Sequence, residues 1–237
     1  MTTTTPFSYA IRRSARATKV RIIVTINKIE VVAPLKIAEK RIHQFVTAQQ
    51  AWIINALNKI TERQPQPCQP VVYGEGTTIV YQGESYTLTL KASPLKRIKI
   101  QFTNEFIVFM SDTLAVNHSE AIKTALANWM NKQLLLEVTR LVKQHAPKHQ
   151  LVPRSLNIKN QKSRWGSCGI HNDIQINALL IIAPPAVLEY VVVHELCHIQ
   201  IRNHSPQFWA LVADHLPDYK TPHHWLKQHG NRLMQGF

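Results

Sequence analysis

The sequence contains only three cysteines in 237 residues. Three cysteines do not build the disulfide framework of a small secreted domain, so they fit a reducing compartment. Transmembrane-length apolar stretches are also missing, because Pro, Glu or His interrupts the runs around 178–188 and 190–199. The first six residues, Met-Thr-Thr-Thr-Thr-Pro, lack the apolar region of a signal peptide. We therefore expect a cytoplasmic protein without a membrane partner.

Acidic residues are few: 14 Asp and Glu stand against 28 Lys and Arg, which gives a formal net charge of +14. Residues 1–63 carry 11 basic and 3 acidic side chains, a net charge of +8, whereas residues 64–150 and 151–237 carry +3 each. Such a basic N-terminal region can attract nucleic acid, ribosomes or acidic proteins. No recognised nucleic-acid motif accompanies it, so the alternative is a solvated face that aids solubility. Its first basic side chains are Arg12, Arg13, Arg16, Lys19 and Arg21.

The most specific pattern in the sequence is His194-Glu195-Leu-Cys-His198. Residues four apart lie on one face of an α-helix, so the two histidines can direct their imidazoles at one point. Neutral imidazole is a good zinc ligand, and a glutamate beside the first ligand can act as a general base. Residues 186–201 are apolar nearly all round, which predicts a buried helix. A glutamate and two histidines are costly to bury in such a helix unless they are paired or bound to a metal. The pattern therefore predicts a zinc site.

A third histidine, His204, follows shortly after this helix. Asn203 tolerates the left-handed backbone that often ends a helix, so the chain can turn and bring His204 back toward the metal. Ser205-Pro206 is typical of the N-cap and first position of a following helix. The spacing is that of metzincins, but the glycine of their motif is missing. We predict His204 as the third ligand. The alternatives are Glu189, Asp214, His215, His223 and His224.

A second segment carries a family resemblance. Residues 161–168 read Gln-Lys-Ser-Arg-Trp-Gly-Ser-Cys, and residues 174–185 read Ile-Gln-Ile-Asn-Ala-Leu-Leu-Ile-Ile-Ala-Pro-Pro. Further motifs are Asn203-His204-Ser205, Phe208-Trp209 and Pro217-Asp218-Tyr219-Lys220. Together with the histidine helix they make the chain, from about residue 8 to Gly230, resemble the YgjP-like metallopeptidase family. That family looks related to the WLM and SprT-like zinc peptidases.

The resemblance implies a zincin-type catalytic half that hydrolyses a protein or peptide substrate. Carried over by position, it implies one zinc ion per chain bound by His194, His198 and His204, with Glu195 as catalytic acid and base. The developing oxyanion needs a second donor besides zinc. Candidates for this donor are Arg164, Tyr219 and His223. Asp214 and Asp218 are candidates for orienting a ligand imidazole.

Two other function classes stay open. The first is a zinc hydrolase acting on a non-peptide amide, which differs from a peptidase in the shape of its pocket. The second is a nucleic-acid-associated protein that acts through its basic N-terminal region, with a catalytically idle zinc helix. A hybrid, a peptidase acting on DNA-bound protein, follows only by analogy with the SprT-like peptidases.

Hydrophobic periodicity predicts an α+β fold: a zincin-like catalytic region, residues 115–235, preceded by a β-rich region, residues 8–112, with one helix. The whole domain then covers residues 8–235. We expect a hairpin over 8–34, a helix over 36–60 with Trp52 on its apolar side, and an exposed Pro/Gln-rich connector over 61–70. Further predicted strands are 71–73, 78–81, 85–91, 96–103, 105–110, 151–160 and 174–182.

A long amphipathic helix is predicted over residues 118–145, with Leu134 and Leu135 on its apolar face. In a zincin architecture one edge strand lies above the metal, where an extended peptide can pair with it. The segment 172–182 is the sequence candidate for that edge strand.

Overall fold

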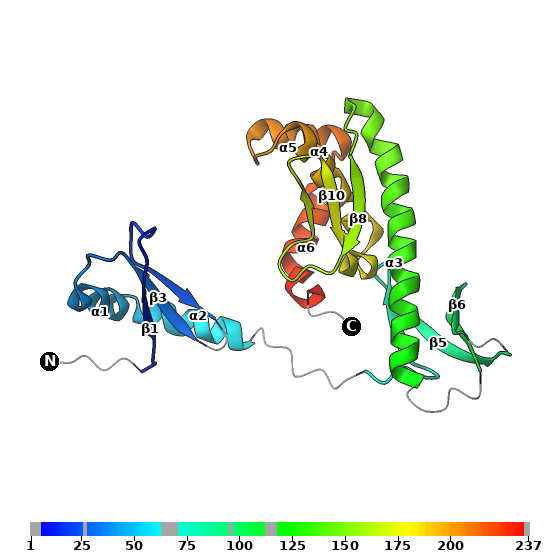
Figure 1. Ribbon diagram of the computed structural model, residues 1–237, viewed down its shortest axis with the longest axis horizontal. Helices are drawn as coiled ribbons and strands as arrows, with labels where there is room; N and C mark the ends of the chain where they lie inside the picture. The colour runs from blue at the N-terminus through cyan, green and yellow to red at the C-terminus, as the bar shows by residue number, and fades with distance from the viewer. Residues whose placement is uncertain (1–5, 26–27, 63–70, 95–96, 112–117, 235–237) are drawn as a thin grey trace. The chain divides into compact units, whose positions relative to one another are not determined.

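The computed structural model describes residues 6–25, 28–62, 71–94, 97–111 and 118–234 of the chain. The chain divides into two units, residues 1–69 and 70–237 (Figure 1). Each unit has its own hydrophobic core. Both units combine helices with sheets, so the predicted α+β class is confirmed. The expected division between residues 112 and 115 lies inside the second unit, because the strands before it share a core with the helix after it.

The first unit is a three-stranded sheet with two helices on one face. Its central strand, β3, runs parallel to β1 and antiparallel to β2. Successive side chains of a strand point to opposite faces, so Ile29, Val31 and Ala33 of β3 share the face that packs on the helices. The elements are β1 (Ala10–Arg13), β2 (Arg21–Val24), β3 (Ile29–Ala33), α1 (Glu39–Ala48) and α2 (Gln50–Glu62). The predicted β2–β3 hairpin is present, and part of its expected turn, Asn27, lies outside the described residues.

The single helix predicted over 36–60 is wrong: the structure has two helices separated at Gln49. Gln49 leaves the helical conformation, with φ −100° and ψ 10°. Ile53, seven residues after the buried Val46, is fully buried as the helical period predicts, whereas Trp52, expected on the apolar side, is 52% exposed. Neither proline nor glycine marks the break in the sequence, so periodicity alone did not indicate it.

The second unit begins with a four-stranded sheet of order β4-β5-β7-β6, in which only β5 and β7 are parallel. The predicted turn between its first two strands is present: Gln82 and Gly83 both have positive φ, as a two-residue hairpin turn requires. The expected strand at 71–73 is wrong, because the Tyr73 amide instead donates to Ser119 Oγ at 2.9 Å. The strands are β4 (Thr78–Tyr81), β5 (Glu84–Ala92), β6 (Lys99–Phe102) and β7 (Phe106–Met110).

The long helix α3 (His118–His145) has the bounds that the sequence predicts. Its buried residues recur about every four positions, on one side of the helix. The apolar ones pack in a single hydrophobic core with residues of both sheets of the unit. The buried residues are Ile122, Leu126, Met130, Leu134, Val138, Leu141, Val142 and His145. Leu135, expected on the same face, is 42% exposed, because it lies one position beyond this stripe.

A second sheet supports the histidine helix and has the order β8-β10-β9. Its strands are β8 (Ser155–Lys159), β9 (Gly166–Cys168) and β10 (Asp173–Asn177). The prediction that 172–182 supplies the edge strand is wrong: β10 is central, parallel to β8 and antiparallel to β9. The Asn177 side chain accepts a hydrogen bond from the Leu179 amide and starts a 3-10 helix, η3 (Ala178–Ile182), which ends the strand early.

Three helices complete the second unit. Pro185 is the first residue of α4 (Pro185–Gln200), which is mostly buried, as its composition predicts. Ser205 caps α5 (Pro206–His215) by accepting a hydrogen bond from the Phe208 amide at 3.4 Å. The last helix is α6 (Lys220–Leu233). Within the described residues, no helix is both long enough and apolar enough to cross a membrane.

Candidate metal centre

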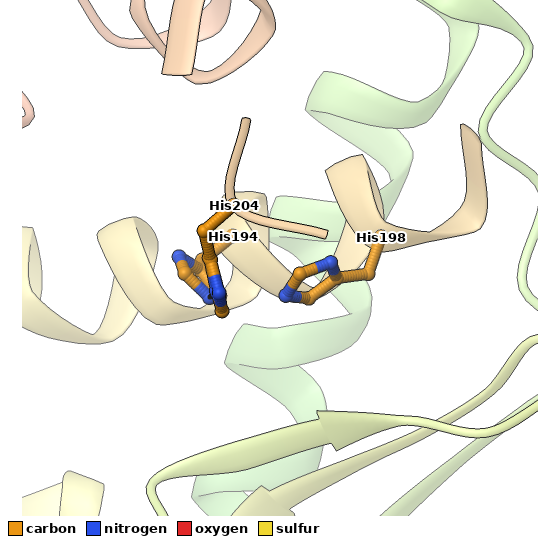
Figure 2. A group of neighbouring side chains, drawn as sticks. All are labelled: His194, His198 and His204. Atoms are coloured by element: carbon orange, nitrogen blue, oxygen red, sulfur yellow. Dashed lines mark hydrogen bonds between the residues drawn. The ribbon is translucent and has the colours of Figure 1, made fainter. Parts of the chain in front are cut away.

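The buried helix α4 places His194 and His198 one turn apart on one face. The loop after α4 brings His204 to the same point, so the three imidazoles point toward one another (Figure 2). One ligand atom from each histidine lies within 4.8 Å of the others, and the Nε2 atoms of His194 and His204 are 3.0 Å apart. Two nitrogens held tetrahedrally at about 2.0–2.1 Å from zinc are roughly 3.3 Å apart. The cluster therefore has the dimensions of a metal site.

Hydrogen bonds prepare the imidazoles of α4 for metal binding. The carbonyl oxygen of Ile201 lies 3.0 Å from Nδ1 of His198, and a carbonyl only accepts, so this nitrogen carries the proton and Nε2 keeps its lone pair. Nδ1 of His194 makes a longer contact, 3.5 Å, with the hydroxyl of Tyr190. Burial, and then the neighbouring imidazoles, lower the pKa of His194 to about 3, which keeps it in the neutral, ligating form.

The short loop 201–205 positions the third histidine. The Asn203 side chain accepts a hydrogen bond from the Ser205 amide at 3.2 Å, which closes a local turn beside His204. Arg202 fastens the loop to the β9–β10 hairpin by donating to the carbonyl of Gly169 at 2.8 Å and to the side chain of Asn172. The third histidine is therefore anchored on both sides.

Aromatic side chains at the start of α5 support the three imidazoles. Phe208 is fully buried and stacks on His198, with ring centroids 4.5 Å apart. Its ring also lies 4.9 Å from that of His194 and 5.0 Å from that of His204. Trp209 is stacked between His204 and Tyr219, at 5.8 and 5.5 Å. Packing on rigid rings limits how far the imidazoles can rotate.

Glu195 is 5% exposed, and burial raises the pKa of its carboxyl group to about 7. A cation held by the adjacent histidines would favour the ionised form. The backbone of β9 passes directly over this side chain: a Cβ added to Gly166 would lie 2.7 Å from Glu195 Oε1. The carboxylate is thus confined between α4 and the edge strand.

The loop 161–165 before β9 is held by Asn177, which is fully buried. Its side-chain amide donates to the carbonyls of Gln161 and Arg164, each at 2.8 Å. Its backbone amide donates to the carbonyl of Trp165 at 2.9 Å. One buried polar residue therefore fixes the entry to the strand that covers Glu195.

The remaining candidate residues lie at different distances from the cluster. His223 borders it: its ring is 5.7 Å from Trp209, and its charge contributes to lowering the pKa of His194. Tyr219 is joined to His204 only through the Trp209 ring. Arg164 is exposed. Asp214 is not brought to the cluster, because its carboxylate pairs with His149 at 2.6 Å and Lys148 at 3.0 Å.

The other sequence alternatives for the third ligand also have different partners. Glu189 accepts from His145 at 2.9 Å, and His224 lies 2.8 Å from the Gln228 amide nitrogen. His215 is buried between the rings of His145 and His149. Among the residues that the structure describes, His194, His198 and His204 form the only group of three or more His, Cys, Asp or Glu whose ligand atoms lie close enough together to hold one metal ion.

Neither described cysteine is suited to act as a nucleophile. Burial raises the pKa of Cys197 to about 12 and also raises the pKa of Cys168, although Arg202 next to Cys168 opposes the shift. Both thiols therefore stay protonated near neutral pH.

Several residues of the site were not identified from the sequence. Phe208 and Trp209 were noted only as a motif of the family resemblance, with no role in the site, although their place four and five residues after His204 was a usable signal. Gly166 and Asn177 act through contacts with distant parts of the chain. A glycine within a strand can mark a close backbone approach, and this was the one local indication for Gly166.

The comparisons with known proteins agree with this geometry. A family model described as YgjP-like, metallopeptidase domain, matches residues 18–229. No curated protein and no solved structure matches the chain. Because the matched range covers most of the 237 residues and includes the whole histidine cluster, the chain belongs to the YgjP-like metallopeptidase family.

Proposed function

We propose that the protein is a zinc-dependent peptidase whose metal is held by His194, His198 and His204, with Glu195 as general base. The observation that carries this proposal is the convergence of the three imidazoles beside a buried carboxylate. A metallopeptidase family supplies the reaction class. Zinc and the role of Glu195 rest on the chemistry of the residues.

The donor set favours zinc. Three neutral imidazoles suit zinc and other transition metals, whereas calcium and magnesium prefer oxygen ligands. Structural zinc sites use four protein ligands, and catalytic sites use three and keep one position open. The three-histidine group therefore fits a catalytic zinc ion, which when bound supplies a Lewis acid that activates water and polarises a carbonyl.

Glu195 is placed to move the proton of this reaction. Its carboxylate takes a proton from the attacking water and then donates it to the leaving amine. Confinement by α4 and by the backbone at Gly166 limits the rotation of the side chain. The buried position excludes bulk water, which strengthens its electrostatic interactions.

His223 is our first candidate for the donor that stabilises the oxyanion. It borders the histidine cluster, whereas Arg164, the other cationic candidate, is exposed. Tyr219 is the second candidate, because its ring belongs to the same stack as His204. Either side chain would act as an electrostatic stabiliser of the transition state.

The proposal is tested with zinc-loaded wild-type protein and the Glu195→Gln variant on a mixed peptide library, read by mass spectrometry. Glu195→Gln keeps the shape of the side chain and removes its basicity. We expect cleavage by the wild type and a loss of about 10²–10⁴-fold in the variant at equal zinc content. Cleavage that survives the substitution would remove Glu195 from the mechanism. A zinc-loaded wild type that leaves every peptide intact but hydrolyses small non-peptide amides would overturn the peptidase assignment.

A further inference from the structure

The sheet of the first unit has one face that no described helix covers. Ile29, Val31 and Ala33 of β3 face α1 and α2, so Glu30 and Val32 point to the opposite face, on which Val32 itself is fully buried. The register pairs Val32 with both Arg12 of β1 and Arg21 of β2. Two exposed arginines therefore flank the central strand on this face.

The charge on this part of the chain is strongly one-sided. Residues 10–33 contain six basic side chains and one acidic side chain, Glu30. Glu30 pairs with Arg12 at 3.2 Å and with Lys28 at 3.3 Å, and hydrogen bonding to Arg12 is the main cause that lowers its pKa. One carboxylate thus offsets only part of the positive charge.

The remaining cations differ in how they are used. Arg13 donates to the carbonyls of Pro34, Leu35 and Ile37 and so holds the connection between β3 and α1. Arg16 and Lys19 lie exposed in the connection between β1 and β2. Within the described part of the chain, Arg16, Lys19 and Arg21 form no ion pair, so their charges are not compensated there.

We propose that this basic surface, made of Arg12 and Arg21 on the sheet, Arg16 and Lys19 in the β1–β2 connection, and Lys28 before β3, binds the phosphate backbone of nucleic acid. Its uncompensated cations, Arg16, Lys19 and Arg21, match a polyanion in charge. Arginine, which provides three of the five side chains, has a planar fork of donors that fits phosphate oxygens. The surface binds independently of the metal centre.

The composition of the face also indicates how binding occurs. None of β1, β2 and β3 contains an aromatic residue, so the strands offer no platform on which bases could stack. The described residues of these strands include no large exposed hydrophobic side chain, which an interfacial membrane anchor needs. The surface therefore binds backbone phosphates through charge and does not distinguish base sequences.

The test measures binding of the full chain to a labelled duplex and a labelled single strand of the same sequence by fluorescence anisotropy, between 50 and 200 mM salt. If three duplex phosphates are contacted, the logarithmic salt slope is about −2.7, and affinity falls roughly 40-fold over this range. Comparing the two ligands shows which form of the backbone is preferred.

The discriminating variant is Arg16→Gln/Lys19→Gln/Arg21→Gln. Its matched control is Lys91→Gln/Lys143→Gln/Lys159→Gln, which removes the same charge from exposed positions of the second unit. We expect the first triple variant to lose at least tenfold in affinity at about 100 mM salt and to reduce the slope by about 2–3, while the control changes affinity less than threefold.

Three results would overturn the proposal: no binding by the wild type at 50 mM salt, equal losses in both triple variants, or tighter binding to anionic lipid vesicles than to either nucleic acid. Circular dichroism and zinc content of both variants show that they are folded. Because neither variant changes the histidine cluster, failure here leaves the proposed peptidase activity untouched.

Discussion

At position 166 the backbone of β9 approaches Glu195 so closely that a side chain has no room. A Cβ there would lie 2.7 Å from two atoms of the Glu195 side chain and 2.9 Å from a third, closer than real Cβ contacts. The clash would push the carboxylate out of place or lift the strand. For Glu195 as the general base that we propose, such a displacement would be costly, because catalysis depends on geometry at the ångström scale.

We therefore predict that Gly166→Ala reduces peptide hydrolysis at least tenfold while zinc is still bound. Gly169→Ala is the matched control, because a Cβ there meets its first neighbour, the carbonyl oxygen of Asp173, at 3.6 Å. Steady-state kinetics of peptide hydrolysis and the zinc content of the two variants test this prediction. Full activity of Gly166→Ala would show that the carboxylate does not need its observed position.

The site residues that could be predicted from the sequence are those placed together by nearby residues of the chain. His194 and His198 are one helical turn apart, so helix periodicity alone places them together. His204 follows within a short loop, and the Ser205 cap that starts the next helix was recognisable. Gly166 and Asn177 act across distances of 29 and 13 residues along the chain, on Glu195 and Arg164, and single-residue patterns carry little information about such contacts.

At the scale of elements, a second histidine cluster joins the end of α3 to α4 and α5. Glu189 of α4 pairs with His145 of α3, and Asp214 of α5 pairs with His149. His215 is buried between these two imidazoles, and both of its ring nitrogens are without a hydrogen-bond partner in the described structure. Burial, and then His149, His145 and Lys148, lower its pKa to about 4, against a weaker opposite effect of Asp214.

This arrangement predicts that stability falls as the pH drops from about 7 toward 4. In this window the unfolded state binds a proton at His215 that the folded state rejects, so acid favours unfolding. We expect the loss attributable to this residue to be about 1–2 kcal/mol. His215→Phe should flatten this part of the profile in urea denaturation, whereas the exposed His171→Phe should leave it unchanged. Parallel profiles for the wild type and His215→Phe would contradict the assignment.

Elements were predicted best where a long apolar period was unbroken. The bounds of α3 and the position of α4 follow from periodicity and from proline at the helix start. The break at Gln49 and the early end of β10 did not, because neither proline nor glycine marks the break and the strand ends at one side-chain hydrogen bond of Asn177. That strand error also misplaced the sheet edge, which β9 and not β10 provides beside α4.

At the scale of the whole molecule, the two separate cores imply that metal binding stabilises only one unit directly. A ligand that binds only the native state adds RT ln(1 + [L]/Kd), about 2.7 kcal/mol when free zinc is 100 times Kd. The histidine cluster is built entirely within residues 70–237.

We predict that removing zinc with a chelator increases amide hydrogen exchange in α4, α5 and β9 but leaves exchange in β3 and α1 unchanged. Hydrogen exchange read by mass spectrometry resolves these segments. The His204→Ala variant should show, with or without added zinc, the same hydrogen-exchange pattern as the chelator-treated wild type. A uniform increase across both units would contradict the separation of the two cores.

The amount of charge follows from the composition, but its arrangement does not. The count is +8 for residues 1–63. Only the structure shows that Arg12 and Arg21 flank one strand on the sheet face without helices, and that Arg13 donates to backbone carbonyls within the fold. The proposed phosphate-binding surface depends on that arrangement.

The central claim, a zinc site made by three histidines, is tested most directly by elemental analysis of purified wild-type, His204→Ala and Glu195→Gln protein. The account predicts about one zinc ion per chain in the wild type and in Glu195→Gln, and a large loss in His204→Ala. A wild-type protein that holds no tightly bound transition metal, even after reconstitution with zinc, would contradict it.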